Sequence, residues 1–165
     1  MNRYFLLVMV FFGLVYSCSD SELLTPGDEF VIPVEPGTFV ADLNGETFDF
    51  STTVSANSNE VATSINGAGD SGETISLSFQ SRIAEGSFNQ AVGAVISIQT
   101  ENGIYLNIGE TGQLLPLSIR VTEVDMADEV VSGTFTGTVY NLALDETLEV
   151  TNGKFHEIPF TLSED

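Results

Sequence analysis

The chain has 165 residues, which is the length of one ordinary domain. Its 24 Asp and Glu residues face only 4 Lys and Arg, so the formal net charge is -20 at pH 7. A few scattered cations cannot build the basic stripe that displaces counterions from phosphates, and this excludes nucleic acid as a partner. A hydrophobic content of 42% is enough to bury a core, so we expect the chain to fold despite its charge.

The first residues read as a secretory leader. Residues 1–17 carry one cation, Arg3, followed by an apolar run from Tyr4 to Tyr16. This run of 13 residues is too short for a membrane-spanning helix, which takes about 20. It ends in Leu14-Val15-Tyr16-Ser17-Cys18, which resembles the lipobox of bacterial lipoproteins, although Tyr16 departs from the usual small or aliphatic residue. The alternative is an ordinary signal peptide followed by an incidental thiol. The single cysteine, however, falls where a lipoprotein leader needs it.

The lipobox resemblance implies cleavage before Cys18 and attachment of lipid to that residue. Two or three acyl chains hold a protein in a membrane almost permanently. With Cys18 blocked, the chain has no other thiol for a disulfide, a metal site or a nucleophile. We therefore predict three parts: a signal peptide over residues 1–17, an acidic flexible tether over 18–29, and a β-domain over 30–165.

The tether begins with Ser19-Asp20-Ser21-Glu22. This acidic stretch is similar to the surface-export signal of Bacteroidota lipoproteins, which implies a place in the outer membrane and exposure at the cell surface. A plain solvated linker explains the same residues.

From Phe30 onward, apolar residues alternate with polar ones at period two, which is typical of strands. Asn-Gly steps supply the positive φ that tight hairpins need, and four of them occur here. The first, Asn44-Gly45, predicts a two-residue turn that pairs Ala41 with Phe48 and Phe39 with Phe50 on one face. The other three steps are Asn66-Gly67, Asn102-Gly103 and Asn152-Gly153.

At the third step we predict a three-residue loop, Glu101-Asn102-Gly103, with a glycine bulge. This loop would align Ile98 with Leu106 and Ile96 with Ile108. Further strands are expected at 60–66, 74–80, 115–124, 131–140, 148–151 and 155–160. Only residues 81–91 offer room for a helical turn. About ten strands without convincing helices predict an antiparallel β-sandwich or a flattened barrel, and we favour the sandwich.

Three segments resemble a family of uncharacterised Bacteroidota lipoproteins that carry one β-rich domain after the lipobox. The segments span nearly the whole expected mature chain. They are Phe39-Val40-Ala41-Asp42-Leu43-Asn44-Gly45, Val131-Ser132-Gly133-Thr134-Phe135 and Val150-Thr151-Asn152-Gly153-Lys154-Phe155. The resemblance implies the same fold class and no established activity.

Candidate chemistry is sparse. His156 is the only side chain that titrates near neutrality without perturbation, and the sequence offers it no convincing partner for catalysis. No Gly-x-Ser-x-Gly elbow is present. Acidic loops at Asp125-Met126-Ala127-Asp128-Glu129 and Asp70-Ser71-Gly72-Glu73 offer oxygen ligands of the kind calcium takes, but solvated turns explain them as well. The outward row Ser132, Thr134, Thr136, Thr138 and Tyr140 presents hydroxyls to solvent, to a polysaccharide or to another protein.

These patterns favour a non-catalytic, lipid-anchored envelope protein that acts as a binding or structural module. The membrane is its expected partner through Cys18, and an envelope protein or a polysaccharide is a further candidate. No cofactor and no metal is expected. The alternative is a calcium-dependent adhesion or glycan-binding module.

Overall fold

The computed structural model describes residues 34–163. Cys18, the leader and the tether lie outside the described residues. The described chain forms one short 3-10 helix, Gln90–Val92, and the following strands: β1 (Thr38–Leu43), β2 (Glu46–Asp49), β3 (Thr53–Ser58), β4 (Thr63–Ala68), β5 (Thr74–Phe79), β6 (Gly86–Asn89), β7 (Val95–Thr100), β8 (Gly103–Leu106), β9 (Leu117–Asp125), β10 (Val130–Asn141) and β11 (Glu146–Leu162). Residues 34–163 include no helix with the length and apolar character that a bilayer crossing requires.

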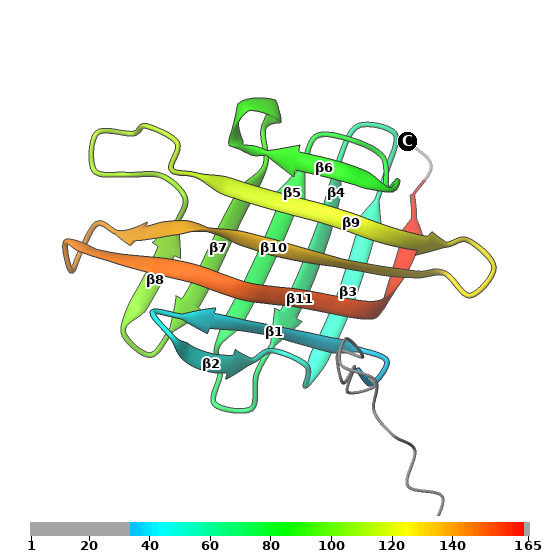
Figure 1. Cartoon of the computed structure of the whole chain (residues 1–165), viewed down its shortest axis with the longest axis horizontal. Coiled ribbons are helices and arrows are strands. Elements are labelled where there is room, and N and C mark those ends of the chain that lie inside the picture. The colour runs from blue at the N-terminus through cyan, green and yellow to red at the C-terminus, as the bar shows by residue number, and fades with distance from the viewer. Residues whose placement is uncertain (1–33, 164–165) are drawn as a thin grey trace, which may run out of the picture. The chain divides into compact units, whose positions relative to one another are not determined.

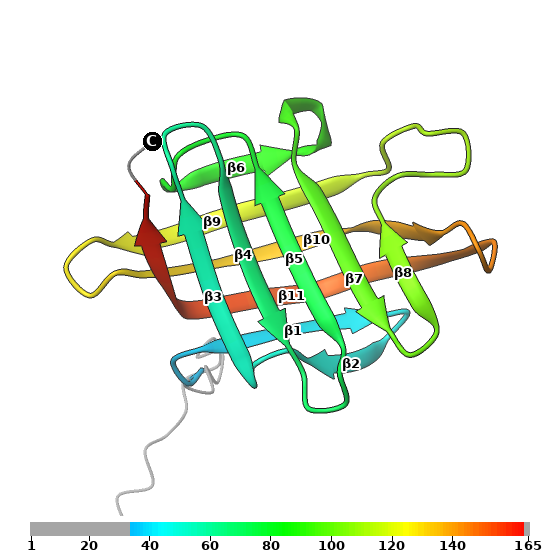
Figure 2. The same cartoon turned by 180° about the vertical axis from the view of Figure 1, so that it is seen from behind.

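The strands form two layers that run crosswise to each other (Figures 1 and 2). The front layer has the order β2-β1-β11-β10-β9-β6, and the back layer has the order β3-β4-β5-β7-β8. The layers join at two corners. The end of β11 pairs in parallel with β3 through Phe160 and Ala56, and β10 pairs with β8 through Tyr140 and Leu106. The all-β fold is therefore confirmed, and the joined corners make the sandwich a flattened barrel.

Aromatic side chains from the front layer fill the centre of the core. Phe39 lies within 5.7–6.2 Å of the rings of Phe50, Phe135 and Phe155, measured between centroids. All four are buried, and each contributes roughly 1.5–3 kcal/mol of hydrophobic stabilisation. Gly133 leaves the space that the Phe155 ring occupies, since a Cβ there would lie 2.4 Å from the ring. Gly133 of β10 therefore permits the close approach of this ring to the strand.

The predicted break in the last strand is wrong. β11 runs through Asn152-Gly153 without a turn, and Asn152 adopts a φ of 51° inside the strand. The pairing with both β1 and β10 shifts at this point, so the step forms a β-bulge instead of a hairpin. The physical reason is that Gly153 lies against Phe135, where a Cβ would meet the backbone oxygen at 2.4 Å. Asn66-Gly67 likewise lies inside β4.

The predicted loop between β7 and β8 is also wrong. Thr100 pairs with Gly103 and Ile98 with Tyr105, so the loop has two residues, Glu101 and Asn102. This register buries Tyr105 and Asn107 and turns the neighbouring aliphatic residues outward. Ile104 is 56% exposed and Ile108 is 38% exposed. A shift of one residue exchanges the two faces of a strand, which is why the predicted partners of Ile96 and Ile98 ended on the wrong side.

The other predicted strands are found with small shifts. The hairpin at Asn44-Gly45 has the predicted register, with Ala41 opposite Phe48 and positive φ at both turn residues. Strand β3 was not predicted, because residues 53–58 carry few apolar side chains. Residues 86–89 form β6 where a helical turn had room, and only Gln90–Val92 is helical.

Candidate functional site

A groove of about 500 Å3 opens between the edge of the front layer and the turns of the back layer. We call it the end groove, because the turns that follow β1, β4 and β7 line it together with the start of β11 (Figure 2). The residues that line it are Leu43, Asn44, Glu46, Phe48, Ser71, Glu73, Thr100, Glu101, Asn102, Tyr105, Glu146 and Leu148.

Tyr105 lies at the floor of the end groove and is only 2% exposed. Its hydroxyl donates a hydrogen bond of 2.6 Å to Glu146 Oε2. Burial raises the pKa of the phenol above 10.0, and the hydrogen bond and charge of Glu146 raise the pKa further. A hydrogen bond from Asn141 acts in the opposite direction. Tyr105 is therefore a neutral hydroxyl at physiological pH that holds one carboxylate of the groove in place.

Asn44 fixes one wall of the end groove. Its side-chain oxygen accepts a hydrogen bond of 2.8 Å from the Glu149 N–H, and its own N–H donates to the Glu149 carbonyl at 2.9 Å. The tip of the β1–β2 hairpin is thus tied to β11. On the opposite wall the β4–β5 turn is closed by the Gly69 N–H, which donates to the Glu73 carbonyl at 2.8 Å. Both walls are held by backbone bonds, so the shape of the groove is largely preformed.

The lining combines apolar surface with carboxylates. Phe48 and Leu148 are half-buried in the groove, and four glutamates surround them. Glu146 is engaged by Tyr105, whereas the carboxylates of Glu46, Glu73 and Glu101 make no side-chain hydrogen bond within residues 34–163. Such a site attracts positive charge and offers aromatic rings for it to pack against.

His156 has a partner that the sequence did not reveal. Its Nδ1 lies 3.3 Å from Ser132 Oγ, and its Nε2 lies 3.5 Å from Glu157 Oε1. Ser132 is 6% exposed, and its hydroxyl already accepts a hydrogen bond of 3.0 Å from the Glu157 N–H. Glu157 has a φ of 49°, so these contacts hold a second bulge of β11. Serine, histidine and glutamate are adjacent here, but the serine hydroxyl is hydrogen-bonded to the backbone of β11.

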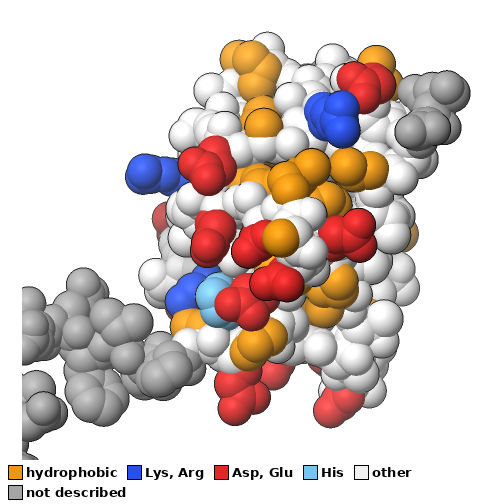
Figure 3. Space-filling view, turned by 90° about the vertical axis from the view of Figure 1, so that its right-hand side faces the viewer, with side chains coloured by type: hydrophobic (Ala, Val, Ile, Leu, Met, Phe, Trp, Pro, Cys, Tyr) orange, Lys and Arg blue, Asp and Glu red, His pale blue; other side chains and the backbone are white. Residues whose placement is uncertain are grey.

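Figure 3 shows acidic side chains gathered around the histidine, while the Lys and Arg side chains stand apart from one another. Arg82 pairs with Glu60 at 2.7 Å. Arg120 and Lys154 lie on either side of Thr134 in the front layer. Thr134 and Thr136 of the predicted hydroxyl row do face outward, whereas Ser132 is buried.

Asp125 and Asp70 of the two acidic loops accept hydrogen bonds from nearby protein groups. Asp125 Oδ1 accepts hydrogen bonds from the N–H groups of Ala127 and Asp128, at 2.8 and 3.1 Å, and these bonds lower the pKa of Asp125. Asp70 accepts a hydrogen bond of 2.6 Å from the Thr52 hydroxyl. Among the described residues, no three His, Cys, Asp or Glu side chains form a group that could hold a metal ion. The calcium alternative gains no support from this part of the chain.

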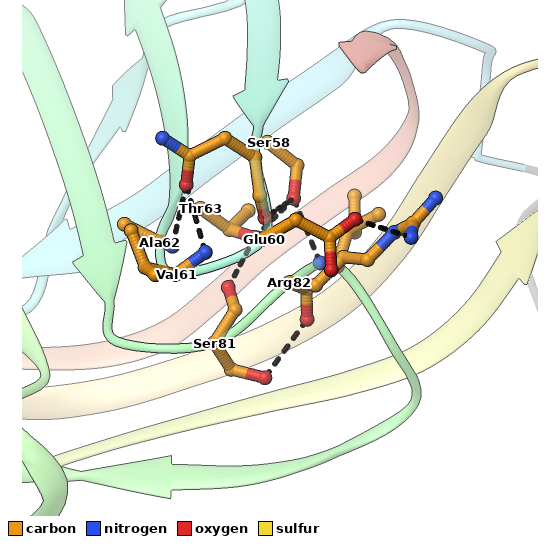
Figure 4. Close-up of polar contacts among 9 residues, drawn as sticks. Ser58, Glu60, Val61, Ala62, Thr63, Ser81 and Arg82 are labelled. Carbon is orange, nitrogen blue, oxygen red and sulfur yellow. Dashed lines mark hydrogen bonds and ion pairs between the residues drawn. The ribbon is translucent and has the colours of Figure 1, made fainter. Parts of the chain in front are cut away.

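A buried polar cluster lies at the other end of β4. Ser58 and Thr63 share a hydrogen bond of 2.8 Å between hydroxyls, and Thr63 donates to the Ser81 carbonyl (Figure 4). Ser58 Oγ also accepts a hydrogen bond from the Ile83 N–H. These polar atoms satisfy one another, so the cluster fastens the loop after β5 to the β3–β4 turn and leaves no group directed at a ligand.

Only part of the end groove could be predicted from the sequence. The Asn44 turn and the 70–73 loop were recognised, but Tyr105, Asn141 and Glu146 were not, because their contacts depend on the β7–β8 register. Cys18, the predicted lipid attachment residue, lies outside the described residues.

Comparisons with known proteins add one relationship. No curated protein and no solved structure gives a significant match to the chain. A family model described as a domain of unknown function, DUF6252, matches residues 35–159. These residues include every strand of the front and back layers that lines the end groove. The chain belongs to the DUF6252 family.

Proposed function

We propose that this protein is a lipid-anchored, non-catalytic binding module of the bacterial cell envelope, and that its ligand enters the end groove. The observation that carries the proposal is the groove itself. It is concave and preformed, and it combines half-buried Phe48 with a carboxylate that Tyr105 holds in place. A surface that served only as packing would not need these features.

The leader supports the anchored part of the proposal. Its lipobox-like end would place lipid on Cys18, and residues 18–29 would form the tether to the outer membrane. The covalent chain enters the domain at the Thr38 end of β1, whereas the end groove lies at the Leu43 end. The two ends are roughly 17 Å apart at about 3.3 Å per residue. A ligand could therefore reach the deepest part of the groove without meeting the point of attachment.

A binding role also fits the arrangement around His156. A serine hydrolase needs a serine hydroxyl that is free to attack, and the Ser132 hydroxyl is buried and accepts a hydrogen bond from the Glu157 N–H. None of the hollows described in the domain is lined by Ser132 or His156.

The anchor is tested by metabolic labelling with a radioactive fatty acid. We expect the wild-type protein to carry the label and to sediment with outer membranes, and the Cys18→Ala variant to do neither. Equal labelling of both proteins would reject lipid attachment at Cys18.

The groove is tested separately by NMR of the isotope-labelled domain, residues 30–165, against a mixed set of small amines, sugars and short peptides. We expect the backbone signals that shift to cluster at Ser71, Asn102 and Glu146. Shifts that cluster elsewhere, or no shifts with any compound, would reject the groove as the binding site.

A further inference from the structure

Strand β2 is an edge strand of the front layer and, among residues 34–163, pairs with β1 alone. Its Asp49 end is covered by the β4–β5 turn, since a Cβ on Gly69 would lie 2.5 Å from the Asp49 carbonyl oxygen. The Phe50 N–H donates to the Phe39 carbonyl at 2.7 Å, so Phe39 and Phe50 are a hydrogen-bonded pair. In an antiparallel ladder such pairs alternate with non-bonded ones, which makes Asp42 and Thr47 a non-bonded pair. The N–H and carbonyl of Thr47 therefore point away from β1.

The part of the β2 edge around Thr47 borders a hollow. This second hollow, of about 290 Å3, is lined by all four β2 residues and by Asp70, Ser71 and Glu73 of the β4–β5 turn. It shares Glu46, Phe48, Ser71 and Glu73 with the end groove. The two hollows together form a channel along β2, with the β4–β5 turn as its opposite wall. We call this channel the edge groove.

The charge of the edge groove has one sign. Its lining includes Glu46, Asp49, Asp70, Glu73, Glu101 and Glu146, and within residues 34–163 no Lys, Arg or His lines either hollow. Two of these carboxylates, Asp70 and Glu146, are hydrogen-bonded to hydroxyls. Glu46 and Glu73 lie on opposite walls at the place where the two hollows meet. A cationic side chain that entered there would meet charge from both walls.

We propose that the edge groove binds an extended peptide segment bearing Lys or Arg at alternate positions, which adds to β2 as an extra strand. The proposal rests on the function proposed above and names the ligand class for the same site. Backbone bonds to Thr47 would provide affinity, and alternate side chains would reach the carboxylates on one side. A strand edge and complementary charge together distinguish this ligand from a simple amine, which would use the charge alone.

Calorimetry and NMR titration with defined probes test the proposal. The first probe is an acetylated and amidated hexapeptide, Lys-Val-Lys-Val-Lys-Val. The second replaces each Lys by Gln. The third keeps the Lys residues but carries N-methyl groups on the backbone nitrogens of the Val residues. We expect only the first to bind well, with shifts at Thr47 and Ser71 and with affinity that falls as salt rises.

Matched variants separate local charge from net charge. The triple variant Glu46→Gln, Glu73→Gln, Glu101→Gln should weaken binding of the first probe about tenfold, because each exposed charge pair contributes modestly and three add together. The control variant Glu85→Gln, Glu123→Gln, Asp128→Asn removes the same charge away from the groove and should change affinity less than about threefold. Circular dichroism checks that both variants fold.

Each contrary result is informative. Equal binding of the Gln peptide would overturn the charge requirement, and equal binding of the N-methylated peptide would overturn strand addition. Equal loss in both triple variants would reduce the effect to net charge and overturn the local site. Failure of all three peptides would overturn the inference, whereas a sugar that shifts Ser71 and Asn102 in the earlier screen would still support the proposed function.

Discussion

The β1–β2 and β7–β8 hairpins both line the end groove, and both contain an Asn-Gly step, yet the step has different roles in them. In β1–β2 the two residues form the turn, with φ of 50° at Asn44 and 85° at Gly45. In β7–β8 the turn comes one residue earlier, and Gly103 is already the first residue of the strand. The dipeptide favours a hairpin, but the side chains that must be buried decide its register.

The deciding side chains in β7–β8 are polar. Asn107 is fully buried, and its side chain accepts a hydrogen bond of 3.0 Å from the Ile96 N–H and donates to the Ala94 carbonyl at 3.3 Å. Tyr105 reaches Glu146 from the same face. The β1–β2 hairpin buries only apolar side chains on its inner face, so its alternation is visible in the sequence. In a strand with buried polar groups, hydropathy therefore does not identify the inward face.

The largest expected effect is on stability, when an inward aromatic residue of each hairpin, Tyr105 or Phe48, is replaced by alanine. Tyr105→Ala should lower the free energy of unfolding by about 3–5 kcal/mol, because it opens a cavity and leaves Glu146 without its hydroxyl. Phe48→Ala should cost about 1–2 kcal/mol, since Phe48 is only half-buried. Urea unfolding measures both values. Equal losses would show that the two hairpins hold their register in the same way.

The two glycines provide the next test. Gly103→Ala should cost about 2–3 kcal/mol, because φ is 134° and the new Cβ would lie 2.6 Å from Asn141 Nδ2. Gly45→Ala should cost about 1 kcal/mol, because φ is 85° but nothing lies within 4 Å of the added carbon. Thermal unfolding of the two variants ranks them. A greater loss at Gly45 would contradict the tight contact at Gly103.

Alkaline pH should lower the stability of the domain through the buried phenol of Tyr105. The folded state raises the pKa of Tyr105, so it holds the proton more tightly than the unfolded state does. Its contribution to stability is fully present below about pH 10 and is lost as the pH rises through the folded-state pKa. Tyr105→Phe should therefore lose less stability than the wild type between pH 9 and pH 11 in urea titrations. A parallel decline in wild type and Tyr105→Phe would contradict the buried role.

The smallest effect concerns Asp42 in the β1–β2 hairpin. The hydrogen bond from the Thr47 hydroxyl lowers its pKa most, and the hydrogen bond from Asn152 lowers it next. Thr47→Val should raise the pKa of Asp42 toward its ordinary value, and Asn152→Gly should raise it less. Carboxyl-detected NMR titration measures both shifts. The reverse ranking would show that the tie to β11 matters more than the bond across the hairpin.

The fold class could be predicted because most strands have one apolar face. Ile75, Leu77 and Phe79 alternate with polar residues in β5, and all three are buried as expected. Strand β3 could not be found in this way, since Ala56 is its only buried apolar residue and Ser58 is buried through hydrogen bonds. Burial that depends on a distant partner leaves no local pattern.

The end groove was harder to predict than the fold for the same reason. Tyr105 and Glu146 are 41 positions apart, and nothing near either residue indicates the other. The Ser132–His156 contact is also invisible locally, because a bulge at Glu157 brings the two side chains together. Contacts made across bulges require the pairing of whole strands to be known first.

The pairing of β1 with β11 also governs when the domain is able to fold. Thr38 is paired with His156, so β1 cannot complete this pairing until β11 has left the ribosome. Contacts this distant along the chain make folding slow, because the chain loses loop-closure entropy before the stabilising contacts form. Until its final strand emerges, the polypeptide cannot complete the front layer.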